Sequence, residues 1–321
     1  MATLVQQRPR RRRALGTIGY VVFLGVVLAA AMFGGWISKS KVLSGMIKRQ
    51  FGFGESPTQT FNSNQLTLLI LGCDEDRQYT GYHQSKVLTE GARSDMMLVA
   101  KLDFAKNSVS GLSIPRDMWC RVDGTGHKMN AFYKFGGTPL AKRAVETLTG
   151  IPIDRVVVIN FDEFQKLVSL VGGVDVNVDK DLDYDDFAGN LHIHLKQGQQ
   201  HLDGNGAMGF VRYRHGDDDF QRQARQKQFL MAFKGAALSH WSNLPAIAEQ
   251  AVQVLGGALQ DDEVAALAMF AKGVPQSNIK MGAVPAVDPD ENPMHLDKRG
   301  LKKALAQFGF TAAGNQRVAA R

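Results

Sequence analysis

Cysteine is scarce in this chain, and its scarcity excludes one class of small fold. Two cysteines among 321 residues cannot hold a disulfide scaffold together, and no Cys/His pair occurs at zinc-finger spacing. A content of 44% hydrophobic and 21% charged residues excludes wholesale disorder. The chain is therefore expected to fold around an ordinary core, as one large domain or two small ones.

Acidic residues are absent before Glu55, and this absence explains the net charge of +7. Nine of the 38 Lys and Arg residues precede Glu55, so 38 minus 9 leaves 29 basic residues against 31 acidic ones, a balance of −2. Binding to nucleic-acid phosphates needs a basic surface on the folded part. No nucleic-acid partner is expected.

Long hydrophobic runs are absent too, except for residues 14–38, which hold no ionisable side chain apart from Tyr20. At about 1.5 Å per residue, this run is long enough for a hydrocarbon core of roughly 30 Å. It predicts a single-pass membrane anchor. The alternative is a signal peptide cleaved near residues 29–31, which N-terminal sequencing of the mature protein would reveal.

Basic residues around this run predict its orientation. Five arginines precede it and two lysines follow it, so residues 1–13 should be a cytoplasmic tail and the rest extracytoplasmic, at the cell membrane. Residues 39–64, with glycines and polar side chains, resemble a juxtamembrane linker. A folded domain is expected at residues 65–310 and a flexible tail at 311–321.

Short apolar, β-favouring runs alternate with helical patterns in the outer domain. Strands are expected at residues 66–72, 96–102, 109–114, 156–161, 174–178, 191–195, 210–213 and 278–284. Helices are expected at 139–148, 162–171 and about 221–240, with two more in 243–272. This order predicts an α/β fold with a sheet covered by helices on both faces, and chemistry at the strand ends.

Arginines and carboxylates recur together at the ends of these expected elements. They are Asp74, Arg93, Asp95, Arg116, Asp117, Arg212, Arg214, Asp219 and Arg222. Surface ion pairs, each worth about 0–1 kcal/mol, explain them equally well on spacing alone. Arg212 and Arg214 favour a site, because residues two apart share one face of a strand and their guanidinium groups repel each other unless an anion lies before them.

A diphosphate with a divalent cation accounts for both charges. Guanidinium binds phosphate oxygens bidentately, whereas carboxylates repel phosphate unless a cation bridges the two. Mg²⁺ typically takes one or two carboxylates with phosphate oxygens and water. The arginines with Asp74 and Asp95 therefore fit a magnesium-diphosphate site.

At these residues the chain resembles the LytR-CpsA-Psr proteins of bacterial cell envelopes. The matching stretches are LLILGCDEDR (68–77), RSDMMLV (93–99), SIPRD (113–117), KMNAFYKFGG (128–137), GIPIDRVVVINFDEF (150–164), LVGGVDVNV (170–178), YDD (184–186), LHIHLKQGQQHLDGNGAMGFVRYR (191–214) and DFQRQARQ (219–226). The resemblance implies a central mixed sheet flanked by helices and a phosphotransferase. Such an enzyme moves a glycopolymer from a polyprenyl-pyrophosphate carrier to peptidoglycan or a related wall polymer.

The resemblance also implies roles for individual residues. The positions that match pyrophosphate contacts are Arg93, Arg116, Arg212, Arg214 and Gln226. Those that match the metal site, for Mg²⁺ or Mn²⁺, are Asp74 and Asp95, and those that match other polar residues of the cleft are Asp117, Lys128, Asp219 and Arg222. The chain departs from the family pattern at Gln221, at His194 and in the longer loop 78–92, which leaves the acceptor contacts open.

The implied reaction is attack by an acceptor hydroxyl on the phosphorus next to the glycan, with polyprenyl phosphate leaving. Arg116, Arg212, Arg214 and Mg²⁺ would neutralise the phosphate oxygens, and Asp117 belongs to the same catalytic group. Asp219 is the candidate base, with a base-free route as the alternative. A lipid-binding regulator without turnover and a pyrophosphate hydrolase are the rival functions.

Other polar residues favour plainer interpretations. His192 and His194 share a strand face but lack a third ligand at a telling spacing, which favours an ordinary strand. The carboxylates at 181, 183, 185 and 186 fit a solvated acidic loop, because the glycine and glutamate of a calcium loop are missing. Cys73 and Cys120 could pair or stay thiols. The region between Phe132 and Val171 could provide the walls of a lipid slot, but its residues Phe135, Phe161, Phe164 and Leu167 suit the core equally well, which is the commoner case.

Overall fold

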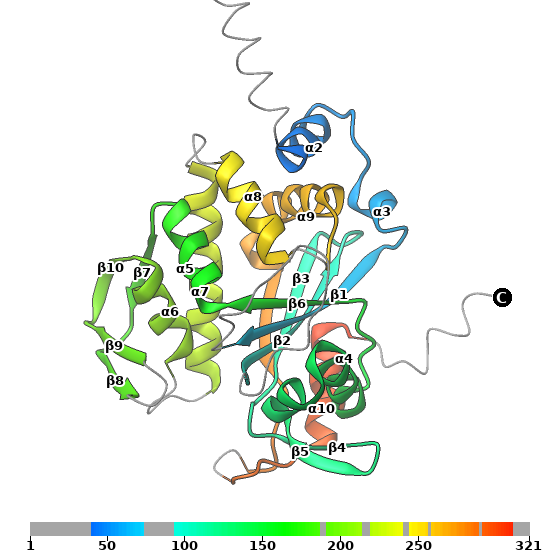
Figure 1. The fold of residues 1–321 in the computed structure, drawn as a ribbon, viewed down its shortest axis with the longest axis vertical. Helices are drawn as coiled ribbons and strands as arrows, with labels where there is room; N and C mark the ends of the chain where they lie inside the picture. Colours follow the sequence, from blue (N-terminus) through cyan, green and yellow to red (C-terminus); the bar gives the residue numbers. More distant parts are fainter. Residues whose placement is uncertain are drawn as a thin grey trace, which may run out of the picture.

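The computed structural model describes residues 40–73, 93–186, 191–213, 219–239, 244–255, 258–288 and 291–310. At its centre is a five-stranded sheet in the order β11-β3-β2-β1-β6 (Figure 1). The bounds are β1 Gln65–Cys73, β2 Ser94–Asp103, β3 Ser108–Ser113, β6 Arg155–Asn160 and β11 Ile279–Ala283. The β1-β2 and β2-β3 pairs are antiparallel, and β1-β6 and β11-β3 are parallel, so the predicted mixed sheet is confirmed.

Both faces of this sheet are covered, because alternate residues of each strand point to opposite sides. Leu69 and Leu71 of β1 pack with α4, Met129–Thr149, and with α10, Lys298–Phe308. Leu66 and Leu68 point the other way and pack beside Leu267 of α9, Asp261–Gly273. Figure 1 shows α4 and α10 together below the sheet and α9 above it. The expected layering is therefore present.

A second hydrophobic cluster lies beside the central sheet. It joins two antiparallel strand pairs, β7 with β10 and β8 with β9, to helices on one side. Their bounds are β7 Val174–Val178, β8 Leu182–Asp186, β9 Leu191–Leu195, β10 Gly198–Leu202, α5 Phe161–Leu170, α6 Gly204–Arg212, α7 Asp219–Ser239 and α8 Leu244–Leu255. Phe210 of α6 and Ile193 of β9 are buried at its centre.

A small hairpin lies below the sheet in Figure 1, formed by β4, Trp119–Val122, and β5, Thr125–Lys128. Asp123 and Gly124 connect the strands with φ angles of 50° and 81°. Two consecutive positive φ angles are the requirement of a type I′ turn, which Asp-Gly satisfies at low cost. The hairpin is thus encoded by its turn residues.

The N-terminal part of the described chain forms two short helices. Within residues 39–64, the structure forms α2, Lys41–Gln50, and α3, Pro57–Thr60. Val42 of α2 is buried against Val264 and Ala265 of α9, and Arg49 lies 2.7 Å from Asp262 of the same helix. Apolar residues on one face of α2 and an ion pair therefore attach this segment to the domain.

The expected strand at residues 210–213 is wrong. These residues end α6, which begins after Asp203, whose side chain accepts a hydrogen bond from the Gly206 amide. Ala207 and Phe210, three residues apart, are both fully buried, as the inner face of a helix requires. Tertiary burial overrides the β preference of this short run, and the expected strand face shared by Arg212 and Arg214 is lost with it.

The acidic segment is also different from the expected loop. Asp183 and Asp185 lie on strand β8, because Leu182 and Tyr184 alternate with them and pack inward. The expected strand at 191–195 is present as β9. The carboxylates are exposed, as a solvated segment predicts, but they are held in register by the neighbouring strand.

Two further expectations concern the membrane and the cysteines. In the part of the chain that the structure describes, none of the helices is long and apolar enough to cross a membrane. The expected anchor at residues 14–38 and the two tails lie outside that part. Cys73 and Cys120 are both buried thiols that no disulfide joins. Burial raises the pKa of the Cys120 thiol, which disfavours a reactive thiolate there.

Candidate active site

A cavity of about 500 Å³ lies where the start of β2, the chain after β3, the β4-β5 hairpin and the first turn of α4 meet. Its lining residues are Arg93, Arg116, Asp117, Trp119, His127, Lys128, Asn130, Ala131 and Phe135. Four of the predicted site residues therefore lie together: Arg93 with Arg116, Asp117 and Lys128. The volume lies within the ordinary range for small-molecule sites, roughly 300–1,000 Å³.

Backbone hydrogen bonds fix the chain that carries Arg116 and Asp117. The Arg116 carbonyl accepts from the Asn130 amide at 3.1 Å, and the Asp117 carbonyl accepts from the Met294 amide at 3.0 Å. Met118, the next residue, is fully buried in the main core. The two charged side chains thus project from a rigid segment that joins the sheet, α4 and the C-terminal region.

Among the described side chains that line this cavity, positive charge exceeds negative charge. The Asp117 carboxylate lies 3.0 Å from Lys128 Nζ and 3.4 Å from Arg116 Nε. With Arg93, three permanent cations face one carboxylate. The Arg116 and Lys128 side chains keep 42% and 34% of their surface exposed, so both are accessible to a ligand. Such a group suits an anion with several oxygens, such as a diphosphate.

Aromatic side chains form another part of the wall. The rings of His127 and Phe135 lie 4.6 Å apart between centroids, at an angle of 36°. The indole of Trp119 packs over Gly126 of β5, so closely that a Cβ atom at Gly126 would lie 2.6 Å from it. Phe135 is 57% exposed, so core packing is the wrong explanation for this residue.

Sequence reasoning did not single out Trp119, His127 or Asn130 as site residues. The Asp123-Gly124 turn was the signal that could have found the first two. It predicts a hairpin, and β4 then alternates exposed Trp119 with buried Cys120. Asn130 and Phe135 both lie in the stretch KMNAFYKFGG.

The other predicted residues lie elsewhere or are described only as backbone. Arg212 is the half-buried last residue of α6 and is not among the described residues that line the cavity. Gln226 is half-buried on α7, where Asp219 is the first residue and Arg222 follows one turn later. Asp95 is the second residue of β2. Asp74 and Arg214 lie outside the described residues.

The register of β1 against β2 bears on the expected metal ligands, Asp74 and Asp95. Cys73 at the end of β1 is paired with Ser94 at the start of β2. Asp74 and Asp95 each follow one of these two residues in the sequence. The register is compatible with two carboxylates contributed from one sheet edge, and the metal itself stays a prediction.

Arg225 connects the helices that carry the remaining predicted residues. Its side chain is 3% exposed, donates a hydrogen bond to the Tyr213 carbonyl at 3.0 Å and lies over the Tyr213 ring. Burial lowers the pKa of Arg225, and the carboxylate of Asp179 opposes that shift. Arg225 therefore fixes α7 against the residue that follows Arg212.

Comparison with known proteins identifies the family. The model of the LytR_cpsA_psr family matches residues 41–306. This chain belongs to the LytR_cpsA_psr family. The resemblance noted from the sequence motifs is confirmed.

Relatives of this family member include named transferases. The polyisoprenyl-teichoic acid–peptidoglycan teichoic acid transferase TagU of Bacillus mycoides (strain KBAB4) is 34% identical over 239 residues, 71% of this chain and 72% of that protein. TagV of Bacillus subtilis (strain 168), which carries the same activity name, is 38% identical over 168 residues, 50% of this chain and 43% of that protein.

Solved structures agree with the family assignment. The crystal structure of B. subtilis TagV matches with a TM-score of 0.57 and 28% identity, covering 77% of this chain and 98% of that one. A structure described as TagT bound to LIIa-WTA matches with a TM-score of 0.59 over 79% of this chain and 91% of that one. At 24% identity, the second match bears on the fold alone.

Proposed function

We propose that this family member is a phosphotransferase that moves a glycopolymer from a polyprenyl-pyrophosphate carrier to peptidoglycan or a related wall polymer. The observation that carries the proposal is the meeting of Arg93, Arg116 and Lys128 around Asp117 in one cavity. The activity name of the TagU relative supports the same donor and acceptor classes.

The chemistry follows from the charges in the cavity. An acceptor hydroxyl oxygen attacks the phosphorus next to the glycan, and the bond from that phosphorus to the bridging oxygen breaks. Polyprenyl phosphate leaves with the electron pair, and the hydroxyl proton passes to a base or to water. Arg116, Lys128 and Arg93 bind the non-bridging oxygens, whose charge the cations neutralise as the transition state forms.

Asp117 holds the two cations in place in this proposal. Its two carboxylate oxygens are divided between Arg116 and Lys128, which fixes both side chains toward the cavity. Such positioning is a large part of catalysis in phosphoryl transfer. Asp219 is proposed as the base that receives the hydroxyl proton, with Arg212, Arg214, Arg222 and Gln226 completing the substrate contacts.

A divalent cation fits the proposed site through the paired strand ends. Mg²⁺ or Mn²⁺, held by Asp74 and Asp95, would neutralise diphosphate oxygens that the basic side chains do not reach. The aromatic wall of Trp119, His127 and Phe135 would pack against apolar faces of the substrate.

The proposed location follows from the N-terminal sequence. Residues 14–38 would anchor the protein in the cell membrane as a single span, with residues 1–13 in the cytoplasm. The domain that contains the cavity would then lie outside the cytoplasm, beside the surface that holds polyprenyl carriers.

The decisive experiment compares two arginines of the same region. The purified full chain is incubated with Mg²⁺, a polyprenyl-pyrophosphate glycan and peptidoglycan fragments. Arg116→Ala should lower kcat/KM by about 10²–10³, as the loss of one charge-stabilising donor does. Arg121→Ala is the matched control, because Arg121 is exposed on β4 and does not line the cavity.

Three other results would contradict the transferase. Full activity in Arg116→Ala would remove the cavity from the reaction. Lipid binding without product at any metal concentration would favour a carrier-binding regulator. Products formed only with water would favour a hydrolase.

A further inference from the structure

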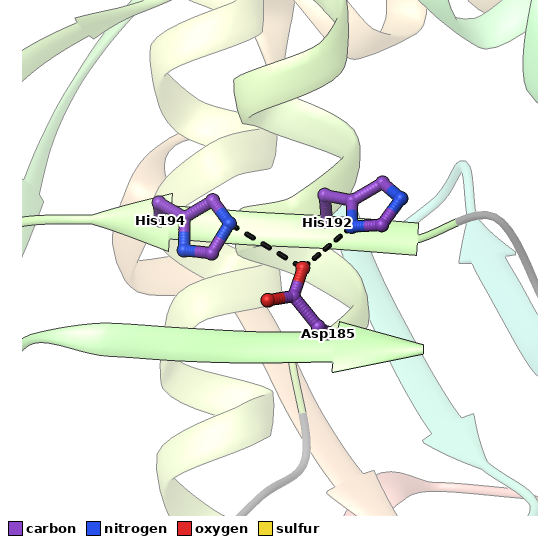
Figure 2. A group of neighbouring side chains, drawn as sticks. All are labelled: Asp185, His192 and His194. Carbon is purple, nitrogen blue, oxygen red and sulfur yellow. Dashed lines mark hydrogen bonds and ion pairs between the residues drawn. The ribbon is translucent and has the colours of Figure 1, made fainter. Parts of the chain in front are cut away.

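A second group of charged side chains lies on the exposed face of the β8-β9 pair. The strands are antiparallel, with Asp185 opposite His192 and Asp183 opposite His194. Ile193 is buried between the two histidines, so alternation along the strand places both imidazoles on the outer face. Figure 2 shows both rings directed at Asp185 from the neighbouring strand. In Figure 1 this pair lies apart from the β4-β5 hairpin that lines the cavity.

One carboxylate oxygen connects the two rings. Asp185 Oδ1 lies 2.5 Å from His192 Nδ1 and 3.4 Å from His194 Nε2. The three side chains each offer one ligand atom, and these atoms all lie within 4.8 Å of one another. Ligands on a tetrahedral zinc ion lie about 3.3–3.6 Å apart, given bond lengths of roughly 2.0–2.2 Å. On this basis the contact between Asp185 and His192 would lengthen by about 1 Å, and the two imidazole ligand atoms, at most 4.8 Å apart, would close toward the same spacing.

The carboxylate of Asp183 gives His194 a partner on its second ring nitrogen. Its Oδ1 lies 2.5 Å from His194 Nδ1, on the side of the ring away from Nε2. A proton held on Nδ1 by this carboxylate leaves the lone pair of Nε2 directed toward Asp185. Metal-binding histidines almost always have such a partner on the second ring nitrogen, because it sets the tautomer and the ring orientation.

We propose that Asp185, His192 and His194 bind one transition-metal ion of the zinc class, oriented by Asp183. Two imidazoles and a carboxylate suit Zn²⁺, Ni²⁺ or Cu²⁺, whereas Mg²⁺ prefers oxygen ligands alone. Three protein ligands with water completing the coordination correspond to an exchangeable rather than a closed structural site. The site shares no residue with the cavity, so it stands independently of the proposed transfer reaction.

The competing explanation is an ordinary cluster of ion pairs between protonated histidines and aspartates. The chain contains a matched example of that case. His201 Nδ1 lies 2.8 Å from Asp175 Oδ1 on the neighbouring β10-β7 pair, and both side chains are exposed. His201 is not among the candidate metal groups found in the described part of the chain. A single pair of this kind lacks the second imidazole that the proposed site has.

The test is a zinc titration of the full chain against a chromogenic chelator at about pH 8, where an ordinary histidine is neutral. The expected result is one equivalent of Zn²⁺ in the wild type. His192→Ala, His194→Ala and Asp185→Asn should each weaken binding by 10-fold or more, and Asp183→Asn by about 10-fold. His201→Ala should leave the affinity unchanged.

Cobalt provides a readout of geometry. Co²⁺ at the site should give the visible absorption of a low-coordinate ion in the wild type and in His201→Ala, and lose it in His192→Ala. Circular dichroism checks that the variants fold, as is expected for exposed side chains. Equal Zn²⁺ affinity in all variants, or no binding at micromolar Zn²⁺, would overturn the proposal.

Discussion

Two carboxylates in this protein are each held between two basic side chains, with opposite chemical consequences. Asp117 lies between Arg116 and Lys128 in the cavity, and Asp185 lies between His192 and His194 on an open strand pair. The distances are alike, at 3.0 and 3.4 Å in the first case and 2.5 and 3.4 Å in the second. The difference lies in what the partners can become.

Arginine and lysine keep their protons at neutral pH, so the described lining of the cavity stays positive and attracts anions. Histidine loses its proton near neutrality and then offers a lone pair, so the strand pair can bind a metal cation instead. The surroundings reinforce this distinction. The cavity side chains lie on a segment that backbone hydrogen bonds attach to the main core, whereas the two histidines lie on an exposed strand face. Among the described side chains of β9, only Ile193 is buried.

The largest effect should come from removing a permanent cation from the cavity. Lys128→Ala is expected to lower kcat/KM for glycopolymer transfer by about 10², because a phosphate oxygen loses its cation and Asp117 loses a partner. His192→Ala should change the same constant by less than about twofold, within the range of an ordinary surface substitution. Steady-state kinetics with a lipid diphosphate donor measures both. An equal loss in the two variants would mean that the strand pair belongs to the transfer site.

A smaller effect, of opposite sign, is expected from the carboxylate in the cavity. Asp117→Asn removes the negative charge between Arg116 and Lys128, so inorganic pyrophosphate should bind about 3- to 10-fold more tightly, up to ~1.4 kcal/mol. Turnover should fall in the same variant, because the two cations lose the group that orients them. Calorimetry measures the binding and the transfer assay measures the turnover.

Asp123→Asn is the matched control for this comparison. Asp123 lies in the turn of the same hairpin and pairs with Arg143 outside the cavity, and asparagine accepts its positive φ. Pyrophosphate affinity should not change there. Weaker anion binding in Asp117→Asn would show that orientation of the cations outweighs their neutralisation by the carboxylate.

The sequence predicted the central sheet well, because its strands are short apolar runs bounded by polar turns. The first strand was expected at 66–72 and forms at Gln65–Cys73. Residues 210–213 failed because a run of four residues has no periodicity of its own, and the burial of Phe210 decides its conformation. The order of strands and their pairing are long-range properties that spacing along the chain does not encode.

The candidate site was predicted in part for a related reason. Residue types and family motifs identified Arg93, Arg116, Asp117 and Lys128, which the fold brings into one cavity. Trp119 and His127 were missed because they acquire a common wall only when the Asp123-Gly124 turn closes β4 onto β5. The spacing of His192 and His194 offers no third ligand along the chain, whereas the facing strand places Asp185 beside both histidines.

The smallest expected effect tests whether a single histidine facing a carboxylate behaves as the comparison requires. The pKa of His201 is raised above its usual value, chiefly by the hydrogen bond to Asp175; burial opposes this shift, and the charge of Asp175, the Gly172 backbone and the charge of Asp203 add to it. Its contribution to stability is therefore complete below the unfolded-state pKa and is lost as pH rises through the folded-state pKa. Because His201 is exposed, the change should appear in its own titration rather than in global stability.

The measurement follows the ring protons of His201 by NMR as pH changes. Asp175→Asn should lower the midpoint toward about 6.5, while the distant Asp123→Asn should not. An unchanged midpoint in Asp175→Asn would mean that a facing carboxylate does not control the charge of an imidazole on this surface. The contrast between Asp117 and Asp185 would then depend on metal binding alone.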